Sequence, residues 1–171
     1  MQYNLSKQKR PSLKFCQKLS LKLFNSPFNK FYLVRLFLKK QFNLPISTNI
    51  SSNFYCSGDN ICVGEHTSFG DNTYLREIGG ITIGHHCSFS YKNMILTGTH
   101  DFANFNIVLA KPVVIGDNVW ITSNVTILPG VTIGSNTVIG AGSVVTHDIP
   151  PGVLAAGNPC KVIKKILFSI E

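Results

Sequence analysis

Three features are scarce or missing in this chain of 171 residues, and each absence disfavours a class of protein. No apolar run approaches the ~20 residues needed to cross a bilayer, and charges interrupt any candidate signal-peptide core. The five cysteines are odd in number and contain no CxxC pair, which disfavours a disulfide framework or zinc site and fits a reducing compartment. Acidic residues are absent before Asp59. We therefore expect a cytoplasmic, single-domain protein with an uneven charge distribution.

The positive charge is concentrated in the N-terminal segment, residues 1–45. Ten of the 16 Lys and Arg residues precede Asp59. We expect this basic amphipathic segment to form two short helices separated near Pro27, the second from about Phe28 to Phe42. The helices can cap the open end of a repeat fold, or lie on an anionic membrane surface at the cytoplasmic face of the inner membrane. No nucleic-acid-reading motif accompanies the charge, so nucleic acid is not an expected partner.

An apolar residue recurs at every sixth position in the second half of the chain. The first row is Ile115, Ile121, Ile127, Ile133, Ile139 and Val145, and the second is Val119, Val125, Val131, Thr137, Ser143 and Ile149. A period of six fits neither a helix, with its period of roughly 3.6, nor an isolated alternating strand; it is typical of a parallel β-helix. A sandwich of ordinary strands would show irregular spacing. We predict an all-β solenoid over residues 46–160, followed by a C-terminal tail, 161–171.

The repeat is interrupted twice. A register of apolar residues that includes Leu75 resumes two residues late, at Ile83. The corner between them is expected to bulge and to push Arg76 and Glu77 outward, either as the edge of a site or as a neutral insertion.

The second interruption is longer and contains a histidine. The register is lost after Ile95 and resumes at Val113, which predicts an extruded loop near 100–112 with His100 at its root. Loops on a rigid scaffold commonly carry functional sites, and histidine can take up and return a proton near neutral pH. A solvated polar pair of His100 with Asp101 is the alternative interpretation.

Several motifs resemble those of a known family. They are Asn53-Phe54-Tyr55, Thr99-His100-Asp101, Gly116-Asp117-Asn118-Val119-Trp120-Ile121, Ile139-Gly140-Ala141-Gly142-Ser143 and Gly157-Asn158-Pro159-Cys160-Lys161-Val162-Ile163. Over about residues 50–165 the chain resembles the hexapeptide-repeat acetyltransferases. The resemblance is closest to the galactoside, maltose and nodulation O-acetyltransferases, and to enzymes that acetylate capsule, colanic-acid or lipopolysaccharide sugars.

The resemblance implies a left-handed parallel β-helix that assembles as a homotrimer, with active sites between neighbouring subunits. It also implies that His100 is the general base, which removes the proton from an acceptor hydroxyl and returns it to the departing CoA thiolate. Asp101 points away from its neighbour in an extended segment, so we do not assign it the role of orienting His100.

The resemblance further implies acetyl-CoA as the acyl donor, and no metal. The family's CoA-binding positions correspond to Trp120, Ser123, Ala141, Thr146, His147, Lys161 and Lys164. Backbone groups of Ser123 and Ala141 would contact the pantetheine arm, and the two lysines would meet the nucleotide phosphates. His147 stands where the family usually has lysine.

Together these features predict an O-acetyltransferase acting on a sugar in surface polysaccharide or lipopolysaccharide biosynthesis. An N-acetyltransferase acting on an amino sugar and a non-catalytic β-helix scaffold are the alternatives. A γ-type carbonic anhydrase would need three histidines converging on zinc. His85, His86 and His100 lack the usual spacing for such a site.

Overall fold

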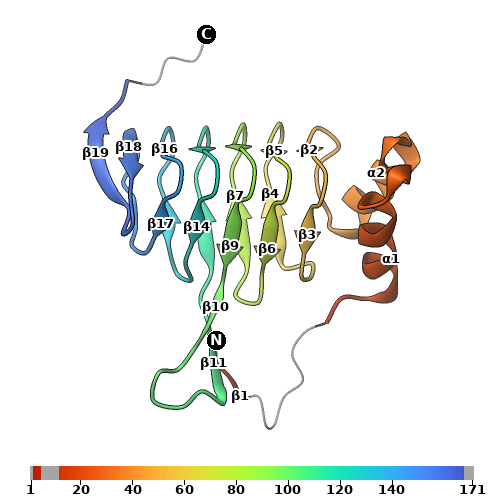
Figure 1. The fold of residues 1–171 in the computed structure, drawn as a ribbon, viewed down its shortest axis with the longest axis horizontal. Helices are drawn as coiled ribbons and strands as arrows, with labels where there is room; N and C mark the ends of the chain where they lie inside the picture. Colours follow the sequence, from red (N-terminus) through yellow and green to blue (C-terminus); the bar gives the residue numbers. More distant parts are fainter. Residues whose placement is uncertain (1, 5–11, 168–171) are drawn as a thin grey trace.

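The structure, a computed structural model, describes residues 2–4 and 12–167 (Figure 1). Its body is a β-solenoid of about five coils, with helices at one end and a hairpin projecting from its side. The predicted β-helix, its N-terminal helical segment and its extruded loop are confirmed.

Three parallel sheets form the walls of the solenoid. The first wall contains β2 (Asn49–Ile50), β5 (Ser68–Phe69), β8 (Ser88–Phe89), β13 (Trp120–Ile121), β16 (Val138–Ile139) and β18 (Val153–Ala156). The second wall contains β3 (Tyr55–Cys56), β6 (Tyr74–Arg76), β9 (Met94–Leu96), β14 (Thr126–Ile127) and β17 (Val144–Val145). The third wall contains β4 (Ile61–Val63), β7 (Ile81–Ile83), β12 (Val113–Ile115) and β15 (Thr132–Ile133). The chain visits them in that order, so the first corner joins the first wall to the second, and the second corner joins the second to the third.

One further strand extends the first wall. Residues 161–165, which we placed in a C-terminal tail, form β19 (Lys161–Lys165) and pair antiparallel with β18. The open edge of β18 is therefore covered by the chain itself.

The six-residue period produces the core. Every residue of the two predicted rows is buried. In the second wall, Ile127 lies in register between Ile95 and Val145, so aliphatic side chains stack from coil to coil. Burying each such side chain contributes roughly 1.5–3 kcal/mol, which no isolated coil could obtain.

Asparagines turn several corners. Asn118 and Asn136 lie one coil apart with φ of 55° and 59°, in the left-handed region that asparagine tolerates better than most residues. Asn118 Nδ2 donates a hydrogen bond to Asn136 Oδ1 at 3.0 Å. The turn residues therefore stack as the strands do.

The N-terminal segment contains α1 (Phe15–Phe24), the 3₁₀-helix η1 (Pro27–Lys30) and α2 (Tyr32–Gln41). The second predicted helix, from Phe28 to Phe42, is thus divided, because Phe31 is extended (φ −78°, ψ 127°). Among the residues described, no helix is both long and apolar enough to span a bilayer.

The helices pack against the first coil of the solenoid (Figure 1). Leu21 and Phe24 of α1 and Leu38 of α2 belong to the same buried cluster as the solenoid core. Asn25 Nδ2 donates to the carbonyl oxygen of Phe54 at 2.9 Å, and the Arg35 guanidinium donates to that of Ile50 at 2.7 Å. The segment therefore covers the end of the solenoid.

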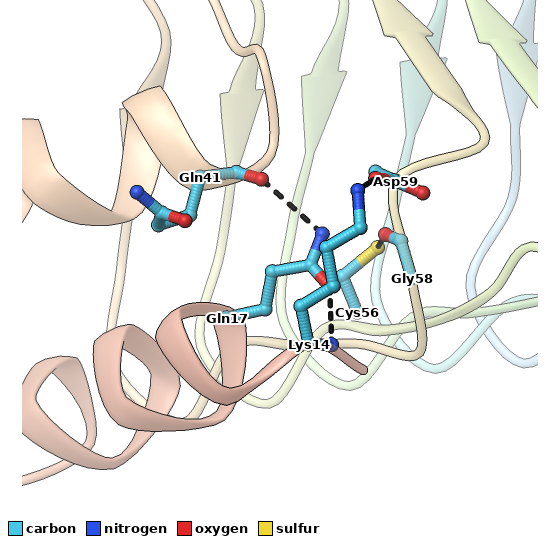
Figure 2. Close-up of polar contacts among 6 residues, drawn as sticks. All are labelled: Lys14, Gln17, Gln41, Cys56, Gly58 and Asp59. Carbon is cyan, nitrogen blue, oxygen red and sulfur yellow. Dashed lines mark hydrogen bonds and ion pairs between the residues drawn. The ribbon is translucent and has the colours of Figure 1, made fainter. Parts of the chain in front are cut away.

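Polar contacts also hold the start of α1 in place, as Figure 2 shows. Buried Gln17 accepts a hydrogen bond from the backbone N–H of Lys14 at 2.8 Å and donates to the carbonyl of Gln41 at 3.3 Å. Lys14 Nζ pairs with Asp59 Oδ2 of the first coil at 3.0 Å, and its hydrogen bond lowers the pKa of that carboxyl. Exposed pairs of this kind contribute about 0–1 kcal/mol, so they orient α1 more than they stabilise it.

Candidate functional site

The extruded loop is a β-hairpin of β10 (Gly98–His100) and β11 (Ile107–Ala110), inserted between the second and third walls (Figure 1). The N-terminal strand β1 (Gln2–Asn4) pairs antiparallel with the other edge of β11. Val108 pairs with His100 and is buried. His100 therefore sits on an ordered three-stranded sheet.

A backbone carbonyl orients the imidazole of His100. Its Nδ1 lies 2.7 Å from the carbonyl oxygen of Phe105. A carbonyl only accepts hydrogen bonds, so the neutral ring carries its proton on Nδ1 and leaves the lone pair on Nε2. Asp101 does not take part, because its Oδ1 accepts the backbone N–H groups of Ala103 and Asn104. His100 is thus arranged to accept a proton at Nε2.

Two adjoining depressions flank the root of the hairpin, and together we call them the hairpin groove. The first has a volume of about 260 Å³ and is lined by Leu96, Gly98, Thr99, His100 and Val108, together with Arg76 and Ile78. The second, of about 280 Å³, shares Arg76 and Ile78 and is lined further by Ser12, Leu13, Lys18, Tyr55, Ser57 and Glu77. The hairpin groove therefore leads from His100 toward the start of α1.

The corner 76–80 is attached to the hairpin root through buried Thr97. The carbonyl oxygen of Arg76 accepts hydrogen bonds from the Thr97 N–H at 3.0 Å and the Thr97 hydroxyl at 2.6 Å. The N–H of Gly79 donates to the same hydroxyl at 2.8 Å. The two extra residues of this corner thus support the base of the hairpin.

One expectation about this corner is wrong. Glu77 is not pushed outward; it is 4% exposed, and its Oε2 accepts a hydrogen bond from the Ser57 hydroxyl at 3.1 Å. Space for the carboxylate comes from Gly58, where a Cβ would overlap Glu77 Oε1. Burial raises the pKa of Glu77, with the Ser57 hydrogen bond opposing the shift.

We expect Glu77→Gln to raise the melting temperature by about 2–4 °C at pH 7, because glutamine keeps an acceptor for Ser57 and removes a buried charge. In the unfolded chain the Glu77 carboxyl ionises at a lower pH than in the folded chain. The stability that the protonated carboxyl gives to the folded state is therefore lost as pH rises from about 4.5 through the raised pKa of the folded state. The advantage of the variant should therefore vanish near pH 4. Thermal melts from pH 4 to 8 measure it, with exposed Glu65→Gln as control. An equal gain at every pH would contradict the argument.

Three of the residues predicted to bind acetyl-CoA, the acyl donor, lie on the first wall and the first corner. Trp120 begins β13, is 50% exposed, and donates from Nε1 to Ser90 Oγ at 3.3 Å. Ser123 and Ala141 occupy the first corner in consecutive coils. The carbonyl of Ser123 accepts the N–H of Gly142 at 3.0 Å, which stacks these two turns.

The other four residues predicted to bind acetyl-CoA lie elsewhere. Thr146 and His147 follow β17 on the second corner, with Thr146 Oγ1 2.8 Å from His147 Nδ1. Lys161 and Lys164 lie exposed on β19, in register with Ala156 and Leu154 of β18.

A single chain therefore does not assemble the whole predicted site. None of the seven residues predicted to bind acetyl-CoA lines the hairpin groove, and His100 is on a different corner from Ser123 and Ala141. Within the described part of the chain, no three His, Cys, Asp or Glu residues are grouped as metal ligands. The role of the Phe105 carbonyl was missed because a backbone carbonyl has no signature in the sequence.

Known proteins share this architecture. The family profile described as Bacterial transferase hexapeptide (six repeats) matches residues 112–147. The putative colanic acid biosynthesis acetyltransferase WcaF of Escherichia coli K12 is 37% identical over 106 residues. That match covers 61% of this chain and 58% of the relative, so the chain spans little more than half of the relative's length.

Two solved structures extend the similarity over most of the chain. A maltose O-acetyltransferase from Clostridium difficile 630 is 42% identical with a TM-score of 0.82, over 88% of this chain and 84% of its own. A hexapeptide-repeat acetyltransferase from Vibrio cholerae, complexed with acetyl coenzyme A, is 28% identical with a TM-score of 0.83, over 89% and 86%. On its repeats, its motifs and its similarity to these structures, the chain belongs to the hexapeptide-repeat acetyltransferase family.

Proposed function

We propose that this chain is an acetyl-CoA-dependent O-acetyltransferase that acts on a sugar hydroxyl, with His100 as general base. The observation that carries the proposal is the hydrogen bond between His100 Nδ1 and the Phe105 carbonyl, which leaves Nε2 free to accept a proton. His100 also lines the hairpin groove, where an acceptor can approach it.

The reaction needs only one proton carrier. Nε2 of His100 removes the hydroxyl proton as the acceptor oxygen attacks the thioester carbon. The C–O bond forms, the C–S bond breaks, and the imidazolium returns the proton to the leaving thiolate. A single imidazole that accepts a proton and then releases it serves both halves of this transfer.

We propose that the donor site is completed by a neighbouring subunit of a homotrimer. The separation of His100 from Trp120, Ser123 and Ala141 supports this arrangement, since the two parts of the site lie on different corners of one chain. Thr146 and His147 are proposed as further contacts to CoA, and Lys161 and Lys164, exposed on β19, as contacts to the nucleotide phosphates.

A thermal-shift titration with CoA tests the donor site. Wild type should be stabilised progressively as CoA is added. The double variant Lys161→Ala/Lys164→Ala should show an affinity lower by about tenfold, or about 1.4 kcal/mol, with a difference that shrinks at high salt. Lys22→Ala/Lys40→Ala is the matched control, because it removes the same number of positive charges but takes them from α1 and α2. Absence of any CoA response in the wild type would overturn the proposed activity.

The acceptor is proposed to be a sugar of a surface polysaccharide or lipopolysaccharide, built at the cytoplasmic face of the inner membrane. The colanic-acid relative and the maltose O-acetyltransferase support a sugar acceptor. An N-acetyltransferase for an amino sugar is the alternative reaction. Mild alkali distinguishes the two products, because an ester is hydrolysed while an amide persists.

We further propose peripheral binding of the N-terminal helices to an anionic membrane surface. Phe28, Phe31, Tyr32 and Leu33 are exposed around Lys30, in a segment without acidic residues. Apolar insertion and attraction to anionic lipid add together.

Sedimentation with phosphatidylglycerol vesicles should recover the wild type, and phosphatidylcholine vesicles should recover much less. Phe31→Ala/Leu33→Ala should weaken binding at least about tenfold, because burial of as few as two CH₂ equivalents contributes about 1.6 kcal/mol at roughly 0.8 kcal/mol each. Phe102→Ala/Val114→Ala removes exposed apolar groups from the hairpin and the third wall and should bind like wild type. Equal recovery of both double variants would contradict the proposed surface.

A further inference from the structure

Arg76 occupies the point where the two depressions of the hairpin groove meet. It lines both of them, and its Cα is in register with Leu96, which also lines the depression at His100. Its carbonyl oxygen is held by the backbone N–H and the hydroxyl of buried Thr97. The backbone that carries this guanidinium is therefore rigidly placed relative to the hairpin.

The charge of Arg76 is not neutralised by an ion pair in the described structure. The one ion pair recorded there joins Lys14 to Asp59. The adjacent carboxyl, Glu77, is turned into the wall against Ser57, and its burial raises its pKa. Lys18 adds a second positive charge to the same groove. The hairpin groove therefore presents two cations, Arg76 and Lys18, whereas the one carboxyl that lines it, that of Glu77, is largely buried and hydrogen-bonded to Ser57.

A planar guanidinium binds carboxylate and phosphate groups through two parallel hydrogen bonds, and such charge-assisted bonds are stronger than neutral ones. A neutral sugar offers no charge to this side chain. We propose that the hairpin groove selects an anionic acceptor, whose carboxylate or phosphate is held by Arg76 while a hydroxyl reaches Nε2 of His100.

This inference rests on the proposed acetyl transfer and adds the class of acceptor to it. The anionic group forms and breaks no covalent bond; it only holds the reacting hydroxyl. Arg76 is therefore a specificity-determining residue, and its loss should remove a preference between acceptors rather than the chemistry itself.

The test compares matched probes on the full chain. Binding of glucuronic acid, its methyl ester, glucose 1-phosphate and glucose is measured by titration calorimetry and by saturation-transfer NMR. Wild type should bind one of the two anionic probes at least about tenfold more tightly than its neutral counterpart. Comparison of glucuronic acid with glucose 1-phosphate shows whether the site takes a carboxylate or a phosphate. The preference should weaken as salt is added.

Two variants separate a local effect from net charge. Arg76→Gln should bind the anionic and neutral probes alike, whereas Lys22→Gln, with the same charge change one turn beyond Lys18 on α1, should keep the preference. Melting curves establish that both variants are folded. Equal binding of anionic and neutral probes by wild type, no binding of any probe at millimolar concentration, or identical behaviour of the two variants would overturn the proposal.

The outcome is separable from that of the proposed function. Failure of the wild type to respond to CoA would refute the donor site while leaving the anion preference readable by binding. A normal response to CoA together with no anion preference would refute only the acceptor class.

Discussion

Replacing His100 with asparagine is expected to lower kcat by about 10²–10⁴-fold, the usual contribution of a positioned general base. The asparagine amide can donate toward the Phe105 carbonyl in place of Nδ1 but cannot take up a proton near neutral pH. The hairpin should therefore keep its shape and lose its chemistry. Release of the CoA thiol in the presence of an acceptor sugar measures the rate.

The control for this variant is His86→Asn, which changes an exposed histidine stacked on His66, away from the hairpin groove. It should retain wild-type turnover. CoA binding by His100→Asn should also match the wild type, since the donor candidates lie on other parts of the chain. Wild-type turnover by His100→Asn would remove His100 from the reaction.

Replacing Ile127 with alanine is expected to lower the free energy of unfolding by about 2–5 kcal/mol. Ile127 is 0% exposed and lies in register between Ile95 and Val145, so truncation leaves a cavity inside the stack. The coils above and below are held in register by hydrogen bonds and cannot close around it. Denaturant unfolding at constant protein concentration measures the loss.

Two further substitutions grade this effect. Ile127→Val removes one methylene and should cost about 0.5–1.5 kcal/mol. Val114→Ala, on the exposed face of the third wall, should cost under about 1 kcal/mol. Equal losses for Ile127→Ala and Val114→Ala would mean that the aliphatic stack is not the main source of stability.

The repeat is the part of this fold that its sequence predicts most completely. A coil of three hexads buries the same positions in every turn, so the burial of Ile121 or Ser143 follows from spacing alone. The extruded loop and the N-terminal segment that covers the end of the solenoid were predictable for the same reason, since each lies where the six-residue period is interrupted or absent. His100 could be picked out because it stands at such a break.

The sequence alone could not predict the contacts that cross between coils. Glu77 turns inward because Gly58, a coil earlier, leaves room for its carboxylate beside Ser57. Residues 161–165 become a strand because β18 exposes an edge that pairs with them. Neither relation is periodic, so spacing carries no sign of it.

The same distinction between sequence and tertiary structure holds for the candidate site. Sequence motifs predicted His100 as the base and a set of residues for binding acetyl-CoA. Only the tertiary structure shows that the Phe105 carbonyl orients the imidazole, that Arg76 lines the same depression as His100, and that Ser123 and Ala141 lie on another corner. The physical reason is that a repeat specifies each residue's own place around the coil. What that residue faces depends on hydrogen bonds and free space supplied by segments that are distant in sequence.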